Sequence, residues 1–389
     1  MFKTIYTFVM FVVYIIAIPF LLLLSFKKKY RSSIPARFFL YKNTPLKSNG
    51  IWFHVCSFGE AKAIKPLVDK LPKDKLRFTT TTHTGKEVID RYSAKRSRYL
   101  PFEVLLFGWI KPQKVLVVME AEFWYLMFYI AKLKGAKTIL INARMSERSY
   151  PKYLKMRWFY KELFKYVDEV YAQSDIDKQR LQSLGATNVK TVGNIKLYDI
   201  QKATKELIKP NGILVCGAST HDKEEELILD AFYNFKQQNK TAKLVLVPRH
   251  PERFDSVYEL SQEFALKHSF SIHRYSQESS FGSDITIVDT LGELVNIYAI
   301  SDIVILGGAF EPIGGHNGAE AAQFGCKIIS GKHYFNQKDI FASIDGIEIV
   351  DKDELSDRLL AYKDIKPSSV TKHSDIQPIL NGILDKIER

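Results

Sequence analysis

Several patterns that mark common protein classes are missing from this chain of 389 residues. It contains three cysteines, Cys56, Cys216 and Cys326, which lie far apart and form no CxxC pair. A disulfide framework and a structural zinc site are therefore excluded, and the chain suits a reducing compartment. The histidines show no HExxH or HxxxH spacing, and no acidic cluster has the pattern of a metal site. We therefore expect no metal and no cofactor.

Motifs of several large enzyme and nucleic-acid-binding classes are also missing. The absence of GxxxxGK[ST] excludes a Walker ATPase, and the lack of GxGxxG after the first strand of either half disfavours a dinucleotide oxidoreductase. Without GxSxG, a hydrolase nucleophile elbow is unsupported. Zinc-finger spacing, basic-region heptads and RNP-like aromatic motifs are absent as well. The net charge of +13 therefore favours an acidic lipid surface or a phosphorylated substrate over nucleic acid.

One long hydrophobic run is present, from Tyr6 to Phe26, without a charged residue. As a helix, it is long enough to cross a bilayer core of roughly 30 Å. A basic cluster at residues 27–31 follows, so the positive-inside rule places the rest of the chain in the cytoplasm. A cleaved signal peptide is the competing interpretation, disfavoured by the length of the run and the lack of a small-x-small site. Residues 1–30 are predicted to be a single-pass anchor whose basic flank contacts anionic lipids.

Short apolar runs alternate with helical patterns along the remaining chain, which predicts parallel, doubly wound sheets. Because the length exceeds what one core usually holds, we predict an α/β protein with two Rossmann-like domains around a cleft. The domains are predicted at 31–205 and 206–389, and the last helix is a candidate to pack back on the first domain. The predicted strands are Ile51–Val55, Leu76–Thr81, Lys114–Met119, Thr138–Asn142, Glu169–Ala172, Val189–Val192, Ile213–Cys216, Lys243–Val247, Ser271–Arg274, Asp284–Val288, Ile303–Leu306 and Lys327–Ile329.

The stretch from Ile303 to Gly331 has a strand, a glycine-rich loop and a helical pattern in sequence. In that order, backbone N–H groups and a helix dipole can meet a phosphate group. A tight turn in any α/β protein is the alternative. His316, Asn317 and Glu320 add a base, an amide and a carboxylate within one helical turn, which favours a nucleotide site.

Carboxylates follow two predicted strands of the first half. Glu60, in Ser57-Phe58-Gly59-Glu60, lies in the first turn of a helix, either as an ordinary N-terminal residue or as a general base. Glu120 and Glu122 follow another strand. Strand alternation would place them on one face, whereas in the loop beyond the strand they need not share one. Such a pair suggests either a glycosidase-like acid and nucleophile or the binding of acceptor hydroxyl groups.

Cations and hydroxyl groups follow other strands. Arg249, in a turn stiffened by two prolines, is either a phosphate-binding fork or part of a solvated basic turn. Arg144 and Lys196 offer two more cations beside small residues. Ser219 opens the first helix of the second half, where it belongs to either a phosphate cradle or a simple helix cap.

Eight of these segments together resemble one family, the 3-deoxy-D-manno-octulosonic acid (Kdo) transferases of lipopolysaccharide synthesis. They follow the family order and cover nearly the whole chain, including the anchor. In two places the chain departs from the family pattern: Tyr125-Leu126 stands where Pro-Asn is usual, and Gly318-Ala319-Glu320-Ala321 replaces a Pro-Leu-Glu-Pro-like run. The matching segments are Ile51–Glu60, Met119–Trp124, Asn142–Ser146, Gly193–Lys196, Ser219–His221, Pro248–Arg253, Asp289–Leu294 and Gly314–Asn317.

The resemblance implies an inverting GT-B glycosyltransferase at the cytoplasmic face of the inner membrane. It implies CMP-Kdo as the donor, a phosphorylated lipid A precursor as the acceptor, and no metal. Glu60 would be the general base, and Glu122 and Lys196 would line the reaction centre. The implied donor-binding residues are Ser219, Arg249, His250, Gly292, Glu293, Gly315, His316, Asn317 and Glu320, and the implied acceptor-binding residues are Ser57, Gly59, Arg144 and Ser146.

Two other functions stay open at this point: a glycosyltransferase of the same fold that uses a UDP-sugar, and a lipopolysaccharide-binding or scaffold protein without activity. The sequence leaves four further points undetermined. These are the number of Kdo residues transferred, the acyl chains accepted, the oligomeric state and the role of His316.

Overall fold

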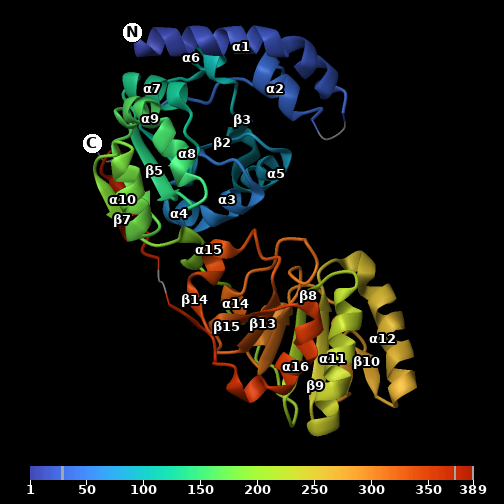
Figure 1. The fold of residues 1–389 in the computed structure, drawn as a ribbon. Helices are drawn as coiled ribbons and strands as arrows, with labels where there is room; N and C mark the ends of the chain where they lie inside the picture. Colours follow the sequence, from blue (N-terminus) through green and yellow to red (C-terminus); the bar gives the residue numbers. More distant parts are fainter. Residues whose placement is uncertain (28–29, 372–373, 388–389) are drawn as a thin grey trace. The chain divides into compact units, whose positions relative to one another are not determined.

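The computed structural model describes residues 1–27, 30–371 and 374–387. The chain forms two compact units, each with its own sheet (Figure 1). Unit 1 comprises Met1–Asp199 and His373–Arg389, and unit 2 comprises Ile200–Lys372. The contacts thus divide the chain at Asp199, slightly before the predicted boundary at residue 205.

Unit 1 is built on a seven-stranded parallel sheet with the order β3-β2-β1-β4-β5-β6-β7. The strand order reverses between β1 and β4, which is where open α/β sheets bind ligands beyond the carboxyl ends of their strands. The strands are β1 (Ile51–His54), β2 (Leu76–Thr80), β3 (Ser97–Tyr99), β4 (Val115–Met119), β5 (Lys137–Ala143), β6 (Glu169–Ala172) and β7 (Val189–Thr191).

Helices cover both faces of this sheet because successive strand residues point to opposite sides. Trp52 packs in one core with α7 (Tyr125–Leu133), α9 (Arg157–Phe164) and α10 (Asp175–Ser183). Its neighbour Phe53 packs in the other core, whose helices are α3 (Phe58–Ala63), α4 (Lys65–Lys70), α5 (His83–Ser93) and α17 (Gln377–Leu384). The short helices α6 (Leu106–Trp109) and α8 (Tyr150–Lys155) complete the unit.

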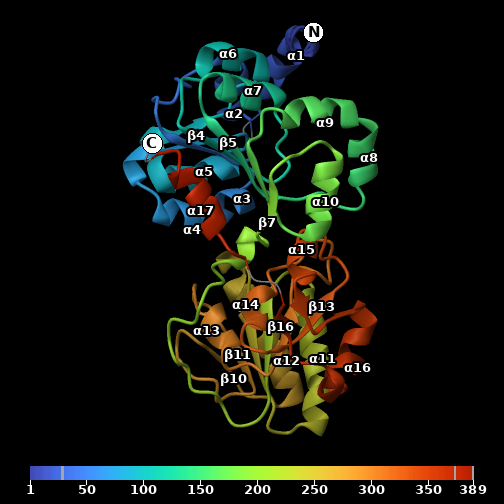
Figure 2. The ribbon, with the colours of Figure 1, turned by 90° about the vertical axis from the view of Figure 1, so that its left-hand side faces the viewer.

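The C-terminal helix α17 returns to unit 1, beside α3, α4 and α5 (Figure 2). Ile379 and Ile383 are buried in the second core. Lys137 Nζ donates to the Gly382 carbonyl over 2.8 Å, and Tyr171 Oη donates to the Pro378 carbonyl over 2.8 Å. The last helix therefore packs back on the unit that begins the chain.

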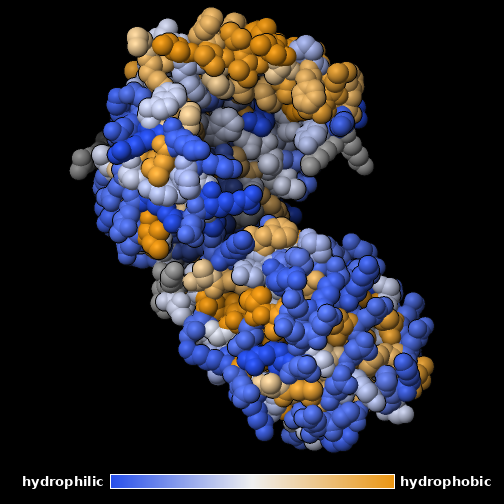
Figure 3. Space-filling view, in the orientation of Figure 1, coloured by the Kyte–Doolittle hydropathy of each residue, from blue (hydrophilic) through white to orange (hydrophobic). Residues whose placement is uncertain are grey.

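Helix α1 (Phe2–Ser25) is long and apolar enough to span a membrane by length and composition, and 6% of its most apolar window is buried. One side of its first half contacts the rest of unit 1: Tyr6 packs on Tyr125 at 4.9 Å and donates to Glu103 over 2.5 Å. Large apolar side chains such as Phe8, Ile16 and Leu23 are exposed elsewhere on α1. They form the apolar band visible over α1 in Figure 3.

Helix α2 (Ser33–Phe39) follows the basic segment. Tyr14 of α1 donates to the Phe38 carbonyl over 2.5 Å, so the two helices are joined. Two members of the predicted basic flank, Lys28 and Lys29, lie outside the described residues.

Unit 2 repeats the parallel architecture with the order β10-β11-β9-β8-β12-β13-β15. One face of the sheet packs on α11 (Glu224–Gln238), α12 (Phe254–His268) and α16 (Leu355–Leu360). The helices α13 (Leu294–Tyr298) and α14 (Ala319–Ala322) lie against β8 and β13, and α15 (Lys338–Phe341) follows β13. The strands are β8 (Leu214–Thr220), β9 (Lys243–Pro248), β10 (Ile272–Arg274), β11 (Ile285–Ile287), β12 (Ile303–Leu306), β13 (Lys327–Gly331), β15 (Ile347–Val350) and the antiparallel pair β14 (Ile344–Asp345) and β16 (Ser369–Val370).

All twelve predicted strands are present, with ends that differ by a few residues. The edge strands β3 and β15 were not predicted, because edge strands are short and carry polar residues, and neither was the two-residue pair β14 and β16. The short helical pattern after the glycine-rich loop is confirmed as α14, which begins at Ala319 and has four residues.

Candidate active site

Glu60 is held at the turn between β1 and α3. Ser57 caps α3, and its Oγ accepts the Glu60 N–H over 3.2 Å. The Glu60 carboxylate in turn accepts the Ser57 hydroxyl (2.8 Å) at Oε1 and the Cys56 N–H (2.8 Å) at Oε2. This reciprocal bonding resembles a capping box, and it gives the carboxylate one defined orientation.

The environment of Glu60 prepares it to accept a proton near neutral pH. The side chain is 8% exposed. Burial, together with the nearby carboxylates of Glu120 and Glu122, raises its pKa to about 7 against the lowering effect of the bonds from Cys56 and Ser57. A carboxylate with a pKa close to the working pH is well matched to general-base catalysis.

Lys196 contacts Glu120 rather than Glu122, the partner that the prediction grouped with it. Its Nζ lies 2.8 Å from Glu120 Oε1, which also accepts from Asn142 Nδ2 over 3.3 Å. Glu122 instead accepts from Trp124 Nε1 over 2.7 Å. Of the two alternatives for this pair, the loop is the one observed: the strand ends at Met119, and Glu120 has a positive φ of 57°.

Two asparagines position Lys196, and neither was among the predicted site residues. Asn142 ends β5 with a φ of 51°, and its Oδ1 accepts the Ile195 N–H over 3.0 Å. Asn194 Oδ1 accepts the N–H of Lys196 over 3.1 Å. Asparagine adopts left-handed backbone more readily than most residues, and this was the available sequence signal.

A second group, His54, Cys56 and Glu122, places its ligand-type atoms within 4.8 Å of one another. His54 is fully buried, which lowers its pKa to about 3, and Arg37 lowers it further. Burial raises the pKa of the Cys56 thiol, with a further increase from Glu122. A metal ion here would have to displace the thiol proton beside the Arg37 charge, so the donor set suits a hydrogen-bonded network better than a metal site.

The four predicted acceptor-binding residues lie after β1 and β5. The Ser57 hydroxyl already donates a hydrogen bond to Glu60. A side chain added at Gly59 would meet nothing within 4 Å, so the helix surface is open there. Arg144 follows β5 directly and is half-buried. Ser146 shares a 2.7 Å bond with the Ser149 hydroxyl at the start of α8 and therefore has a local structural role as well.

In unit 2, Glu224 ties the start of α11 to the loop after β12. It is 1% exposed, and its Oε2 accepts the N–H groups of His221 (3.0 Å) and Gly308 (2.8 Å). Its Oε1 accepts the Phe310 N–H over 3.1 Å. Glu224, which was not among the predicted site residues, therefore anchors the glycine-rich loop.

Three histidines gather beside this loop. His316 Nε2 lies 2.8 Å from His221 Nε2, so one ring donates and the other accepts. The His250 ring lies 5.4 Å from the His221 ring. Burial, with smaller contributions from His221, Arg249 and His250, lowers the pKa of His316 to about 4. The nearby Arg249 supplies a positive charge, and the rings supply N–H donors, so the group is suited to an anion.

Backbone N–H groups of the glycine-rich loop donate hydrogen bonds within the loop itself. Gly314 (φ 121°) and Gly315 (φ 80°) both donate to the Gly308 carbonyl, over 3.0 and 2.6 Å. Asn317 Oδ1 accepts the Ala319 N–H over 3.0 Å, and its Nδ2 donates to Glu320 Oε1 over 3.3 Å. The expected cradle of free glycine N–H groups is therefore wrong for these two glycines.

The remaining predicted donor-binding residues occupy three other loops. Glu293 accepts from Lys205 Nζ and from Asn296 Nδ2 over 3.0 Å, and these bonds lower its pKa in spite of burial. Gly292 precedes it with a φ of 90°. Ser219 lies in β8, one residue before its end, with a φ of 53°. The prediction that it opens the helix is wrong, because α11 begins at Glu224. The Arg249 N–H donates to the Thr220 carbonyl over 3.0 Å and fixes the turn from which its exposed side chain extends.

Arg253 is the second arginine of the Pro248–Arg253 motif, and it binds a carboxylate of this chain. Its guanidinium binds Glu225 at both oxygens, over 2.7 and 3.0 Å. Such a paired fork braces α11 and leaves Arg249 as the exposed arginine of the motif.

Two Rossmann-like units with polar groups after the carboxyl ends of their strands define the GT-B class of fold. UDP-GlcNAc 2-epimerase from Neisseria meningitidis, solved with UDP-GlcNAc, shares this fold: the match covers 86% of this chain and 100% of that one, at 12% identity and a TM-score of 0.50. The C-terminal CMP-Kdo binding domain of WaaA from Acinetobacter baumannii is 27% identical, with 46% of this chain and 88% of that domain covered and a TM-score of 0.36.

Sequence comparison adds the family. A model described as 3-deoxy-D-manno-octulosonic-acid transferase (kdotransferase) matches residues 32–199, which end where the first segment of unit 1 ends. The 3-deoxy-D-manno-octulosonic acid transferase of Haemophilus influenzae is 32% identical over 367 residues, covering 88% of this chain and 84% of the relative. The chain therefore belongs to the Kdo transferase family, and it is a glycosyltransferase, as the eight motifs predicted.

Proposed function

We propose that this protein transfers Kdo from CMP-Kdo to a phosphorylated lipid A precursor, with inversion at the anomeric carbon and Glu60 as the general base. One observation carries the proposal: the Glu60 carboxylate is oriented by two hydrogen bonds and has a pKa of about 7. Family membership supports the sugar that is transferred.

The proposed reaction is a single displacement. The acceptor hydroxyl gives its proton to Glu60 while its oxygen forms the bond to the anomeric carbon. The bond from that carbon to the phosphate oxygen breaks, and CMP leaves with the electron pair. A base that is largely ionised just above neutral pH suits this proton transfer.

On the donor side, Arg249, His250 and His316 would stabilise the phosphate of the leaving group. Their cationic and N–H groups lie around the turn between β9 and α12 and the loop after β12. Charge stabilisation of this kind requires no metal in the proposed step. Ser219, Gly292, Glu293 and the loop residues Gly315, Asn317 and Glu320 would shape the remainder of the donor site, with Gly315 acting through loop conformation.

On the acceptor side, Lys196 and Arg144 would meet the phosphorylated sugar, beside Ser57, Gly59 and Ser146. The ion pair of Lys196 with Glu120 would hold the lysine extended toward substrate. Glu122, held by its hydrogen bond from Trp124, would line the reaction centre. Apolar α1 supports an inner-membrane anchor with both units in the cytoplasm, where a lipid acceptor would be reached.

The test is transfer by the full-length protein in detergent, with CMP-Kdo and a lipid A precursor and with product mass as the readout. We expect Glu60→Gln to lower kcat by about 100-fold or more, as loss of a general base does. Glu87→Gln, an exposed glutamate of α5, is the matched control and should transfer at the wild-type rate. Wild-type transfer by Glu60→Gln would overturn the assignment of the base.

The same assay separates the other functions. Sugar transfer from UDP-sugars but not from CMP-Kdo would replace the donor and favour a different glycosyltransferase. Binding of the lipid A precursor without turnover of either donor would favour a scaffold. The product mass also gives the number of Kdo residues added.

A further inference from the structure

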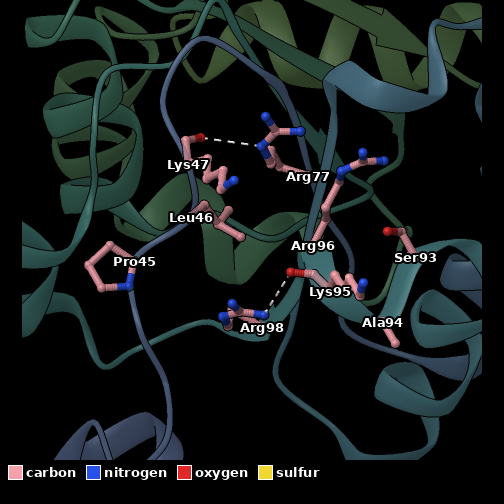
Figure 4. A pocket seen from close by; sticks show the side chains of 9 residues that line it. All are labelled: Pro45, Leu46, Lys47, Arg77, Ser93, Ala94, Lys95, Arg96 and Arg98. Carbon is pink, nitrogen blue, oxygen red and sulfur yellow. Dashed lines mark hydrogen bonds between the residues drawn. The ribbon is translucent and has the colours of Figure 1, made fainter.

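A second site of unit 1 is a pocket of about 360 Å³ that has five cationic side chains in its lining. Figure 4 shows how they converge from three separate segments. No aspartate or glutamate belongs to the described lining. The five cations are Lys47, Arg77, Lys95, Arg96 and Arg98.

The sheet brings these segments together away from Glu60. Arg77 is the second residue of β2, and Arg98 of β3 pairs with Thr79 of β2. Arg77 and Thr79 are two residues apart, so Arg77 and Arg98 lie on the same face of the sheet. Residues 45–47 precede β1, whereas Glu60 follows it. The pocket is therefore separate from the carboxyl-end site.

Arg77 carries a buried positive charge whose hydrogen-bond partners among the described residues are carbonyls. It is 8% exposed, and its guanidinium donates to the carbonyls of Lys47 (3.3 Å), Asp74 (2.8 Å) and Leu76 (2.8 Å). Burial lowers its pKa and Arg96 lowers it further, while the charge of Asp74 acts in the opposite direction. Carbonyl oxygens satisfy N–H donors but supply no counter-charge, which is costly for a buried cation.

The other arginines are braced in the same way. Arg96 Nη1 donates to the Lys73 carbonyl over 2.7 Å, and Arg98 Nε donates to the Thr44 carbonyl over 3.1 Å. Among the ion pairs found in the described residues, none includes any of the five cations. Arg98 also donates to the carbonyls of Lys95 and Ser97 and to the Thr44 hydroxyl. Since a guanidinium has five N–H donors, Arg96 keeps most of its donors for a ligand, Arg77 keeps two and Arg98 keeps one.

The wall of the pocket is a built structure rather than a loose surface. The Lys47 carbonyl accepts from Gln113 Nε2 (3.0 Å) as well as from Arg77, and Gln113 Oε1 accepts the Gly50 N–H (3.0 Å). A side chain at Gly50 would meet Arg77 Cγ at 2.7 Å, so only glycine admits this packing. A solvated basic face would need neither this close packing nor a buried arginine.

We propose that this pocket binds a phosphate group, supplied either by a phospholipid headgroup or by free phosphate. Arginine forks match phosphate oxygens in geometry and charge, and a bound dianion would neutralise the uncompensated cations. The site is distinct from the donor and acceptor sites of the proposed transfer reaction, so its test does not depend on the outcome for those sites.

The first test is thermal unfolding of the full-length protein in detergent, with inorganic phosphate compared with chloride at equal ionic strength. CMP is present throughout so that nucleotide sites are occupied in both series. We expect Lys95→Gln/Arg96→Gln to raise the half-maximal phosphate concentration by at least about tenfold, because two charge-assisted contacts are lost.

The matched control is Lys240→Gln/Lys267→Gln, which removes the same charge from two exposed lysines of unit 2. It should respond to phosphate as the wild type does. An equal phosphate response in the pocket variant and the wild type would overturn the proposal, as would an equal loss in the control. Arg98→Gln gives a second, independent variant of the pocket, for which we expect the same direction of change.

Flotation with vesicles distinguishes the two sources of phosphate. Vesicles of phosphatidylcholine are compared with vesicles that also contain phosphatidylglycerol, and each is measured with and without inorganic phosphate. For a headgroup site, phosphatidylglycerol increases binding of the wild type more than of the pocket variant, and inorganic phosphate competes. For a free-phosphate site, phosphatidylglycerol changes the binding of the wild type and of the pocket variant by the same amount, while the unfolding difference persists.

Discussion

Lys196 Nζ lies 2.8 Å from Glu120 Oε1, and Glu120 is one of the carboxylates that raise the pKa of Glu60. The ion pair therefore links a cation of the proposed acceptor site to the electrostatics of the proposed base. Asn142, which donates to the same carboxylate oxygen, completes the link from β5. Each of these residues comes from a different strand end, so the protonation of Glu60 depends on the whole carboxyl edge of the sheet.

Glu120→Gln should move the acid limb of the kcat/KM profile to lower pH. The change removes a negative charge that raises the pKa of Glu60 and frees the Lys196 charge, and both effects favour the ionised base. The pH profile of Kdo transfer measures the shift, with Glu87→Gln as the control that leaves it in place. A limb that stays fixed, or that moves to higher pH, would contradict the proposed coupling.

Glu60→Gln should stabilise the protein at pH 8 while it abolishes transfer. A buried carboxyl with its pKa raised from 4.5 to about 7 favours folding below pH 4.5, and that contribution is lost as the pH rises through 7. The neutral glutamine escapes this loss, so its stability relative to wild type should grow between pH 5 and pH 8, by about 1–3 kcal/mol.

Thermal unfolding at the two pH values provides this comparison. Glutamine can accept the Cys56 N–H and donate to Ser57, so the turn should survive the substitution. If the stability of Glu60→Gln relative to wild type decreases toward pH 8, the pKa of Glu60 is not raised in the folded protein.

Glu224→Gln should destabilise unit 2 by about 1–3 kcal/mol. The new NH2 group is a donor and would face backbone N–H groups, from which it cannot accept hydrogen bonds. The same change should raise the KM for the sugar donor, since Gly308 and Phe310 lose their anchor. Thermal unfolding and steady-state kinetics report the two effects. Glu226→Gln, an exposed neighbour on α11, is the control, and equal behaviour of the two variants would refute the anchoring role.

Gly314→Ala should destabilise the protein by about 1–3 kcal/mol because its backbone is strained for other residues. The added carbon would also lie 2.0 Å from Asn336 Nδ2, and φ is 121°. Gly59→Ala, with no atom within 4 Å of the new carbon, should leave the unfolding temperature unchanged. A tolerated Gly314→Ala would mean that the loop has another conformation available.

By itself, the sequence determined the strands and the capped carboxylate. Buried parallel strands are continuous apolar runs, so Ile303–Leu306 and Glu169–Ala172 could be located to the residue. Ser57 and Glu60 have capping-box spacing, a local pattern that needs no distant partner. The eight ordered motifs likewise sufficed for the family.

Tertiary structure alone decided which side chains meet. Lys196 pairs with Glu120, whose backbone is left-handed just beyond the end of β4. At Asn142 the residue type gives a sequence signal for such a conformation, but at Glu120 it gives none. Gly314 and Gly315 turn their N–H groups toward Gly308, six or seven residues earlier, so their apparent phosphate cradle is closed. The cationic pocket exists because β1, β2 and β3 are neighbours in the sheet, and pairing of distant strands is a property of the folded chain.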